Sequence, residues 1–287
     1  MRNKGKNINI TANSITVNYT DEGQENAPVI IFIHGFPFSK EMWNKQMEVL
    51  IDNFRVIAYD IRGHGKSYAG SDDFSIELFV GDLLLLMKEL QIEKTTLCGL
   101  SMGGYIALNA MEKHPERFDA LVLCDTQCLA DSPEAKGKRM KAIEGLWENG
   151  VEKFADDSVK NFFAQESFST KKEVVAGIRE TIVNTTEKSI IKTLLALSKR
   201  KETCTKLQEI KVPVLIVVGE KDKITPPEAA QLMHEKIVGS ELSIIKHAGH
   251  LSNLENPEQF NELLKRFLEN NVGSQKRSWE KETGSLS

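Results

Sequence analysis

The chain has 287 residues, 40% of them hydrophobic and 27% charged, and 37 Lys and Arg against 41 Asp and Glu give a net charge of −4. This composition is typical of a soluble globular protein with a sizeable core, and without a basic stripe we expect no nucleic-acid partner. No stretch approaches the roughly 18 uninterrupted apolar residues of a membrane span, and no apolar segment follows the polar N-terminus. We therefore expect neither membrane association nor a secretion signal.

Four cysteines, Cys98, Cys124, Cys128 and Cys204, occur in the sequence. We interpret them as buried, reduced thiols of a cytoplasmic protein; an exported protein with disulfides is the alternative. No pair of cysteines or histidines has the C-x-x-C or H-x-x-x-H spacing of a metal site, so we expect no metal ligands.

Strand-like and helix-like segments alternate along the first part of the chain. Residues 8–19 alternate apolar and polar side chains around Asn13-Ser14, which predicts an antiparallel hairpin. Helical patterns begin at Ser39, at Ser75 and near Tyr105. Between them lie short apolar runs, which are typical of strands buried on both faces of a parallel sheet, at 28–33, 55–59, 95–99 and 120–124. This order predicts an α/β fold with a doubly wound, mostly parallel sheet.

The alternation stops after residue 126, and only helix-like patterns follow until strands resume at 212–218 and 241–246. A final amphipathic helix is predicted at 257–269. We therefore predict a helical cap, or lid, inserted between the strand at 120–124 and the strand at 212–218. The predicted domains are a core formed by 1–126 and 206–272, the cap at 127–205, and a disordered tail at 273–287.

Ser101 lies at the centre of G-L-S-M-G, where a predicted strand turns abruptly into a predicted helix. This is the Gly-x-Ser-x-Gly pattern of a nucleophile elbow. So sharp a turn brings the helix backbone close to the strand backbone, so the positions two before and two after the serine exclude bulk. We expect the Ser101 hydroxyl to be exposed above the sheet on a strained backbone.

A serine nucleophile requires a base and a group that orients the base, both at strand ends on the same edge of the sheet. His250 follows the last predicted strand and Asp222 follows the strand at 212–218. We favour His250 over His247 as the base, and Asp222 over Asp125 as the acid. The chain order Ser, Asp, His is that of α/β-hydrolases.

Five segments together carry a resemblance to a known family. They are H-G-F-P from residue 34, D-I-R-G-H-G-K-S from 60, G-L-S-M-G-G-Y from 99, G-E-K-D-K-I-T-P from 219 and A-G-H-L-S-N-L-E-N-P from 248. In this order they resemble the α/β-hydrolase fold family, and most closely its branch of small carboxylesterases, 3-oxoadipate enol-lactonases and serine haloperoxidase-like proteins.

The resemblance implies a catalytic triad of Ser101 as nucleophile, His250 as general base and acid, and Asp222 as orienting acid. It also implies an oxyanion hole formed by the backbone N–H groups of Phe36 and Met102, and it implies no cofactor and no metal. We predict a serine hydrolase that cleaves a small carboxylic ester or lactone through an acyl-serine intermediate. Acyl transfer or C–C bond hydrolysis with the same triad, and a non-catalytic signalling partner, are the alternatives.

Other polar and aromatic residues have competing interpretations. Candidates for the substrate pocket are Phe38, Trp147, Phe162 and Phe163, although aromatic residues of the cap are more often its own core. Arg139 is a candidate for binding a carboxylate, against a role on a solvated helix face. His34 is predicted to brace the oxyanion loop, and Asp60, Arg62 and His64 to satisfy each other and the backbone.

Overall fold

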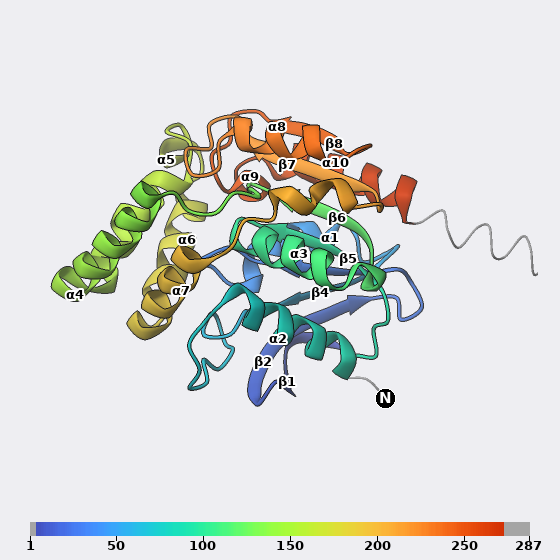
Figure 1. The fold of residues 1–287 in the computed structure, drawn as a ribbon, viewed down its shortest axis with the longest axis horizontal. Helices are drawn as coiled ribbons and strands as arrows, with labels where there is room; N and C mark the ends of the chain where they lie inside the picture. The colour runs from blue at the N-terminus through green and yellow to red at the C-terminus, as the bar shows by residue number, and fades with distance from the viewer. Residues whose placement is uncertain (1–3, 273–287) are drawn as a thin grey trace, which may run out of the picture.

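A single eight-stranded sheet forms the centre of the protein in a computed structural model that describes residues 4–272 (Figure 1). The strands follow the spatial order β1-β2-β4-β3-β5-β6-β7-β8. Their bounds are β1 Gly5–Ala12, β2 Ile15–Gly23, β3 Val29–Ile33, β4 Arg55–Tyr59, β5 Thr95–Leu100, β6 Phe118–Cys124, β7 Val214–Gly219 and β8 Glu241–Ile245. The predicted tail at 273–287 lies outside the described residues.

The strands from β4 to β8 in this order pair in parallel, while β2 pairs antiparallel with both β1 and β4. Asn13 and Ser14 join β1 to β2 with φ angles of 51° and 61°, a conformation that suits a two-residue hairpin turn. The hairpin and the mostly parallel, doubly wound sheet are therefore confirmed.

Helices cover both faces of the sheet, because each of its central strands is apolar on both sides (Figure 1). One core cluster packs α2 (Ile76–Glu89), α3 (Met102–Lys113) and α8 (Pro227–Lys236) against one face. A second cluster packs α1 (Asn44–Glu48) and α10 (Pro257–Asn271) against the other.

Residues 127–205, which we call the helical insertion, lie between β6 and β7 and project from one end of the sheet, at the left of Figure 1. Their helices are α4 Pro133–Phe162, α5 Ser167–Thr170, α6 Lys172–Val183 and α7 Glu187–Lys199. Gly150, where we expected the first helix to end, has a φ of 76° and divides α4 at a kink. The last turn of α4 reaches the sheet, since Phe162 belongs to the same core cluster as α1 and α10.

Shorter elements depart from the sequence-based expectations. Ser39 does not cap a long helix: its side chain makes no capping hydrogen bond, and a 3₁₀ turn η1 (Lys40–Trp43) precedes the short α1. Ser75 does cap α2, because its side chain accepts a hydrogen bond from the backbone N–H of Leu78. The remaining short elements are η2 Pro115–Arg117, η3 Cys204–Glu209 and α9 Ser252–Glu255.

The interpretation of all four cysteines as reduced thiols is wrong, because Cys128 and Cys204 form a disulfide. Cys98 and Cys124 are free and buried, as expected. The bonded pair is 76 positions apart in sequence and meets only because the two ends of the helical insertion return to the same place. Since disulfides are typical of oxidising compartments, the pair removes the reduced-thiol argument for a cytoplasmic location.

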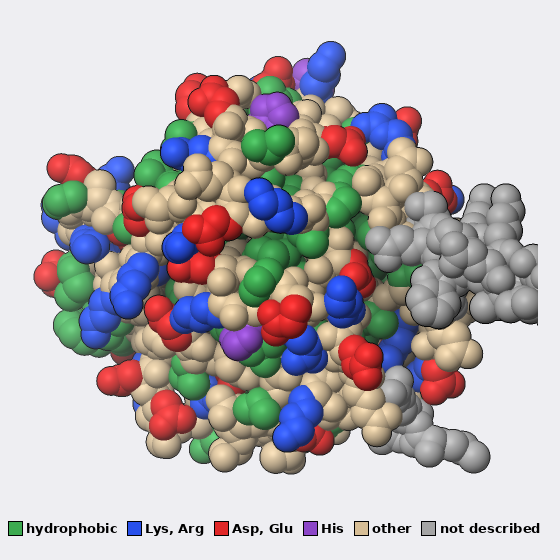
Figure 2. Space-filling view, turned by 45° about the vertical axis from the view of Figure 1, so that its right-hand side comes forward, with side chains coloured by type: hydrophobic (Ala, Val, Ile, Leu, Met, Phe, Trp, Pro, Cys, Tyr) green, Lys and Arg blue, Asp and Glu red, His purple; other side chains and the backbone are tan. Residues whose placement is uncertain are grey.

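Among the helices within residues 4–272, none combines the length and the apolar composition needed to cross a membrane. Figure 2 shows Lys and Arg side chains interspersed with Asp and Glu on one face of the molecule.

Candidate active site

Ser101 occupies the single residue between β5 and α3, in the turn that the G-x-S-x-G pattern predicts. Its φ of 53° and ψ of −113° lie outside the regions that non-glycine residues ordinarily populate. Two hydrogen bonds hold this strained backbone: the Ser101 N–H donates to the carbonyl of Cys124 at 2.9 Å, and the Thr126 hydroxyl donates to the Ser101 carbonyl at 2.8 Å. The strain is thus maintained by the end of the neighbouring strand β6.

The glycines two positions before and two after Ser101 leave no space for a side chain. A Cβ atom on Gly99 would lie 2.3 Å from the carbonyl oxygen of Gly103. A Cβ atom on Gly103 would lie 2.1 Å from the carbonyl oxygen of Ile33, at the end of β3. The predicted close approach of helix to strand is confirmed, and it also brings the elbow against the loop that follows β3.

Three side chains from three strand ends form a hydrogen-bonded chain. His250 Nε2 lies 2.9 Å from Ser101 Oγ, and His250 Nδ1 lies 2.8 Å from Asp222 Oδ2. A carboxylate only accepts hydrogen bonds, so Nδ1 carries the proton and Nε2 is left to accept one from the serine hydroxyl. Ser101 is buried at 8% exposed, so it is less accessible than we predicted, but it is more exposed than Asp222 at 4% and His250 at 1%. The serine is therefore the most accessible member of the chain of three.

The Asp222 carboxylate is held by its own loop. Oδ1 accepts the backbone N–H groups of Ile224 and Thr225, at 2.8 and 3.0 Å, and Oδ2 accepts the Thr225 hydroxyl at 2.8 Å. The same hydroxyl lies 3.2 Å from His250 Nδ1. Our sequence reasoning missed Thr225, although a threonine three residues after an aspartate in a strand-end loop is a signal for such a side-chain bridge.

The competing histidine and aspartate lie elsewhere. His247 is exposed, and its Nδ1 lies 3.6 Å from Glu166 of the helical insertion. Asp125 is buried, and its carboxylate accepts hydrogen bonds from Gly219 N at 2.8 Å and Ser252 Oγ at 2.6 Å, not from His250. Burial, and then the charge of Asp222, raise the pKa of Asp125 well above its usual value. The structure thus brings His250 and Asp222 to Ser101, and neither alternative.

The two predicted oxyanion-hole donors belong to two backbone segments that meet at the elbow. Met102 N is the first amide of α3, where the helix supplies no carbonyl partner. Phe36 belongs to the loop after β3, against which Gly103 packs. His34 ties this loop to the end of β4: its Nε2 accepts the N–H of Ile61 at 2.9 Å, and its Nδ1 donates to the Gly35 carbonyl at 2.7 Å. Burial lowers the pKa of His34 to about 4, so the ring is neutral and has the bracing position predicted for it.

The polar residues of the D-I-R-G-H-G-K-S loop bind partners outside the loop more than each other. Asp60 Oδ2 pairs with the buried ammonium of Lys40 at 2.9 Å. Arg62 pairs with Asp82 of α2 at 2.7 Å. His64 Nδ1 donates to the carbonyl of Arg62 at 3.1 Å. These contacts support a structural role and agree in part with the prediction: within the loop His64 contacts the Arg62 carbonyl and Asp60 Oδ2 also accepts the Lys66 N–H at 2.9 Å, but the ion-pair partners lie outside the loop.

Of the four candidates for the substrate pocket, Phe162 lies nearest the chain of three. Its ring stacks on that of His250, with centroids 6.1 Å apart, and Phe38 packs behind it at 5.0 Å. Phe163 is buried and contacts Phe168 instead. Trp147 is 64% exposed on the helical insertion.

Phe154 and Arg139, both in α4, also have clear partners. Sequence reasoning missed Phe154, whose ring lies 6.4 Å from that of Phe36 and so brings α4 to the predicted oxyanion loop. The Arg139 side chain is ion-paired with Asp131 at the start of the helical insertion. The carboxylate that Arg139 contacts in the structure is therefore that of Asp131, within the same chain.

Comparison with known proteins gives a consistent family. Residues 28–257 match the model of a family described as alpha/beta hydrolase fold. The chain is 29% identical over 262 residues to 3-oxoadipate enol-lactonase 2 of Acinetobacter baylyi, which covers 90% of this chain and 96% of the relative.

Two solved structures share both fold and sequence with the chain. A thermophilic esterase from Thermogutta terrifontis superposes with a TM-score of 0.86 at 32% identity, covering 92% of this chain and 98% of that one. An enol-lactonase from Burkholderia xenovorans LB400 superposes with a TM-score of 0.85 at 29% identity, covering 91% and 99%. The chain therefore belongs to the α/β-hydrolase fold family, in the branch that contains these esterases and enol-lactonases.

Proposed function

We propose that the protein is a serine hydrolase that cleaves small carboxylic esters or lactones, with Ser101, His250 and Asp222 as its catalytic triad. The observation that carries this proposal is the continuous hydrogen-bonded chain from Ser101 Oγ through both nitrogens of His250 to Asp222. Membership of a family branch with esterase and enol-lactonase relatives supports the same reaction class.

In the proposed reaction, Ser101 Oγ attacks the carbonyl carbon of the substrate while its proton passes to His250 Nε2. The N–H groups of Phe36 and Met102 stabilise the negative charge that develops on the carbonyl oxygen. His250 then gives the proton to the alkoxide that leaves, and Ser101 carries the acyl group.

A water molecule completes the turnover. It loses a proton to His250, attacks the acyl carbon and releases the carboxylic acid, and His250 returns the proton to Ser101 Oγ. In a lactone the alkoxide and the acyl group belong to one molecule, so the product is a single hydroxy or oxo acid. The same proton path therefore serves both substrate classes.

The helical insertion is proposed to act as the lid of the site. The Phe162 ring against His250 and the Phe154 ring against Phe36 support this role, since both project from α4 to the proposed machinery. Apolar rings at this position exclude water and favour an apolar acyl or alcohol group.

Labelling with a fluorophosphonate tests the nucleophile directly. The probe should modify the wild-type protein once, at Ser101, and should leave Ser101→Ala unlabelled. Equal labelling of the two proteins would contradict the assignment, and thermal unfolding of Ser101→Ala provides the control for an intact fold.

A panel of p-nitrophenyl esters of increasing acyl length, run beside lactones of matched ring size, then separates ester from lactone hydrolysis. The serine variant should lose turnover of every substrate that the wild type accepts. Absence of turnover across the panel would instead favour acyl transfer, C–C bond hydrolysis or a non-catalytic role for the same fold.

A further inference from the structure

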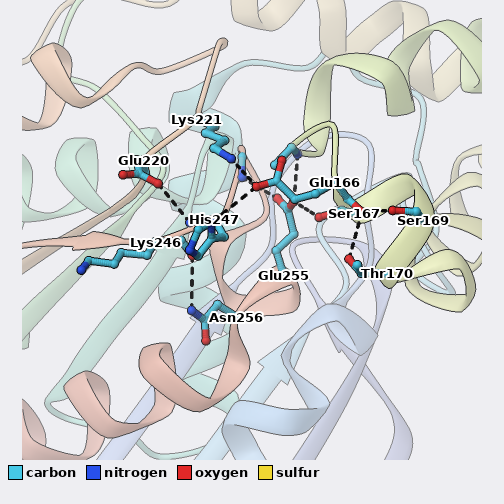
Figure 3. A network of polar contacts seen from close by, with 12 residues as sticks. Glu166, Ser167, Ser169, Thr170, Glu220, Lys221, Lys246, His247, Glu255 and Asn256 are labelled. Carbon is cyan, nitrogen blue, oxygen red and sulfur yellow. Dashed lines mark hydrogen bonds and ion pairs between the residues drawn. The ribbon is translucent and has the colours of Figure 1, made fainter.

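Glu255 is a buried carboxylate that the proposed reaction does not use. It ends α9, is 4% exposed, and lies in the network of Figure 3, where its side chain extends toward the segment that follows α4. Burying a carboxylate is unfavourable unless several donors satisfy it, so its position needs a physical reason.

Its two oxygens accept hydrogen bonds from opposite sides. Oε2 accepts the backbone N–H of Ala164 at 2.8 Å and the hydroxyl of Ser167 at 2.5 Å, both in the helical insertion. Oε1 accepts the backbone N–H of Gly249 at 2.7 Å, one residue before His250. A single carboxylate therefore joins the helical insertion to the loop that carries the proposed base.

Other contacts at this junction converge on His250. The His250 N–H donates to the carbonyl of Phe162 at 2.8 Å, and the two rings are stacked. Gly249 packs so closely that a Cβ atom there would lie 2.8 Å from Ala164 N. The backbone of the base and of the residue before it thus packs directly on residues 162–164.

An outer layer of charges closes the same junction at the surface. Glu166 is ion-paired with Lys221 and lies 3.6 Å from His247, while the His247 N–H donates to Glu220 at 3.2 Å (Figure 3). These side chains are solvent-exposed or partly so, and surface ion pairs contribute little. The buried hydrogen bonds of Glu255 are therefore expected to contribute more than these ion pairs to holding the junction together.

We propose that Glu255 is a positioning residue for the base: its carboxylate fixes residues 162–167 and the His250 loop to each other, so that His250 is aligned on Ser101 while the helical insertion is seated. This inference rests on the proposed function. It predicts that lid and base form one unit, and that loosening the lid at this point weakens proton transfer between Ser101 and His250.

Glutamine is the informative substitution, because it keeps the shape of the side chain but replaces one acceptor oxygen with a donor. In Glu255→Gln the amide NH₂ must face either Gly249 N or the pair Ala164 N and Ser167 Oγ, so one side of the junction is lost. Misplacement of a catalytic group by about 1 Å reduces the rate by up to about 100-fold. We expect kcat per active site to fall 10- to 100-fold, with little change in KM.

The pH profile gives a second readout. The acidic groups that face His250 are Asp222, Asp125 and Glu255, and each, when ionised, favours the protonated form of the ring. Burial raises the pKa of Glu255 itself, so its effect on His250 grows as the pH rises through that pKa. Glutamine removes this acidic group and leaves the other two. The acid limb of the kcat/KM profile should therefore move to lower pH in Glu255→Gln, with both variant and wild type normalised by fluorophosphonate titration of Ser101.

Glu166→Gln is the matched control, since it removes a neighbouring carboxylate of the same network that makes no contact with Gly249. It should retain the wild-type kcat and pH profile. Ser167→Ala removes one donor to Glu255 and keeps Gly249 in place; it should lower kcat per site a few-fold without moving the acid limb, and it serves if Glu255→Gln does not fold.

The outcomes separate this inference from the proposed function. If the wild type labels at Ser101 but Glu255→Gln keeps the wild-type kcat per site and pH profile, the positioning role is wrong and the triad stands. A lower yield of active sites with unchanged kcat would mean that Glu255 only stabilises the fold, which also overturns it. A wild-type protein that does not label at Ser101 would overturn both proposals.

Discussion

The protonation of His250 is decided by two opposing effects at the scale of single residues. Burial of the imidazole lowers its pKa, but Asp222 and, after it, Asp125 and Glu255 together raise it by more, so the pKa of His250 is above its usual value. Burial raises the pKa of Asp222, but His250 and the backbone N–H groups of Thr225 and Ile224 together outweigh it, so the pKa of Asp222 is lowered. Each partner thus stabilises the charged form of the other.

The sign of this shift predicts the pH dependence of activity. In the proposed reaction the free enzyme needs neutral His250 to accept the serine proton, so kcat/KM should fall as the pH is lowered through the raised pKa of His250, on the alkaline side of 6.5. Asp222→Asn removes the charge that raises this pKa and the acceptor that orients Nδ1–H. We expect kcat to drop by on the order of 10⁴-fold and the acid limb to move to lower pH, measured as the pH profile of ester hydrolysis.

Asp125→Asn is the comparison that isolates the role of Asp222. It removes a second buried carboxylate near His250 that makes its hydrogen bonds to Gly219 and Ser252 instead. Its effect on kcat should be much the smaller of the two. A loss equal to that of Asp222→Asn would reverse the assignment of the acid.

Sequence reasoning found the three residues of the hydrogen-bonded chain because strand ends on one edge of a parallel sheet converge. It missed Thr225 and Glu255, whose roles depend on which way a loop turns after its strand. Glu255 contacts a residue 91 positions away through a backbone N–H, and no pattern of side chains records such a contact. The candidate residues at strand ends can thus be predicted from the sequence, whereas the hydrogen bonds that hold them in place are visible only in the structure.

At the scale of elements, the elbow depends on two backbones in direct contact. In Gly99→Ala the new Cβ atom would meet the carbonyl carbon and oxygen of Gly103 at 2.5 and 2.3 Å, and backbone cannot move aside as a side chain can. Overpacking of a rigid site destabilises proteins by 1–3 kcal/mol or more, and we expect about 3 kcal/mol or above here. Urea denaturation followed by circular dichroism measures it.

Gly137→Ala is a suitable control because it makes the same substitution in an exposed turn of α4, where a Cβ atom meets nothing within 4 Å. Alanine has the higher helix propensity, so this variant should be more stable by up to about 1 kcal/mol. Equal unfolding midpoints for the two alanine variants would mean that the elbow tolerates bulk, contrary to its geometry.

The elements of the core were predictable and those of the helical insertion less so, for a physical reason. A strand buried on both faces must be apolar throughout, which is visible in sequence without knowledge of its neighbours. A surface helix shows one apolar face but not what covers it. Trp147 in α4 therefore looked like a pocket residue, yet it is 64% exposed, whereas Phe154 on the same helix reaches Phe36.

At the scale of the whole molecule, the helical insertion is fixed to the core at separate places. Lys192 of α7 donates to the carbonyls of Ser71 and Asp72, and Glu255 fixes the segment after α4. The disulfide Cys128–Cys204 joins the two ends of the insertion where they leave and re-enter the core, and the Thr203 N–H donates to the Cys128 carbonyl beside it. The insertion is thus a closed loop in both the folded and the unfolded chain.

Opening that loop should destabilise the fold more than it affects the chemistry. For a disulfide that spans 76 positions, loop-closure entropy predicts about 4 kcal/mol of stabilisation, equivalent to a Tm shift on the order of 10 °C. Cys128→Ala with Cys204→Ala should therefore unfold at a lower temperature than the oxidised wild type. Its activity at 25 °C should persist, because Ser101, Asp222 and His250 belong to strand ends of the core.

Reductant provides the matched condition. Wild type treated with dithiothreitol should unfold at nearly the same temperature as the double variant. The Tm of the double variant should not change with dithiothreitol. The Tm of Cys98→Ala, which keeps the disulfide, should fall with dithiothreitol as that of the wild type does. Titration of thiols in the unfolded oxidised protein should find the two free cysteines, Cys98 and Cys124, and four after reduction. An unchanged Tm once four thiols titrate would show that the folded insertion does not need the bond, and that its stability rests on the contacts of α4 and α7 with the core.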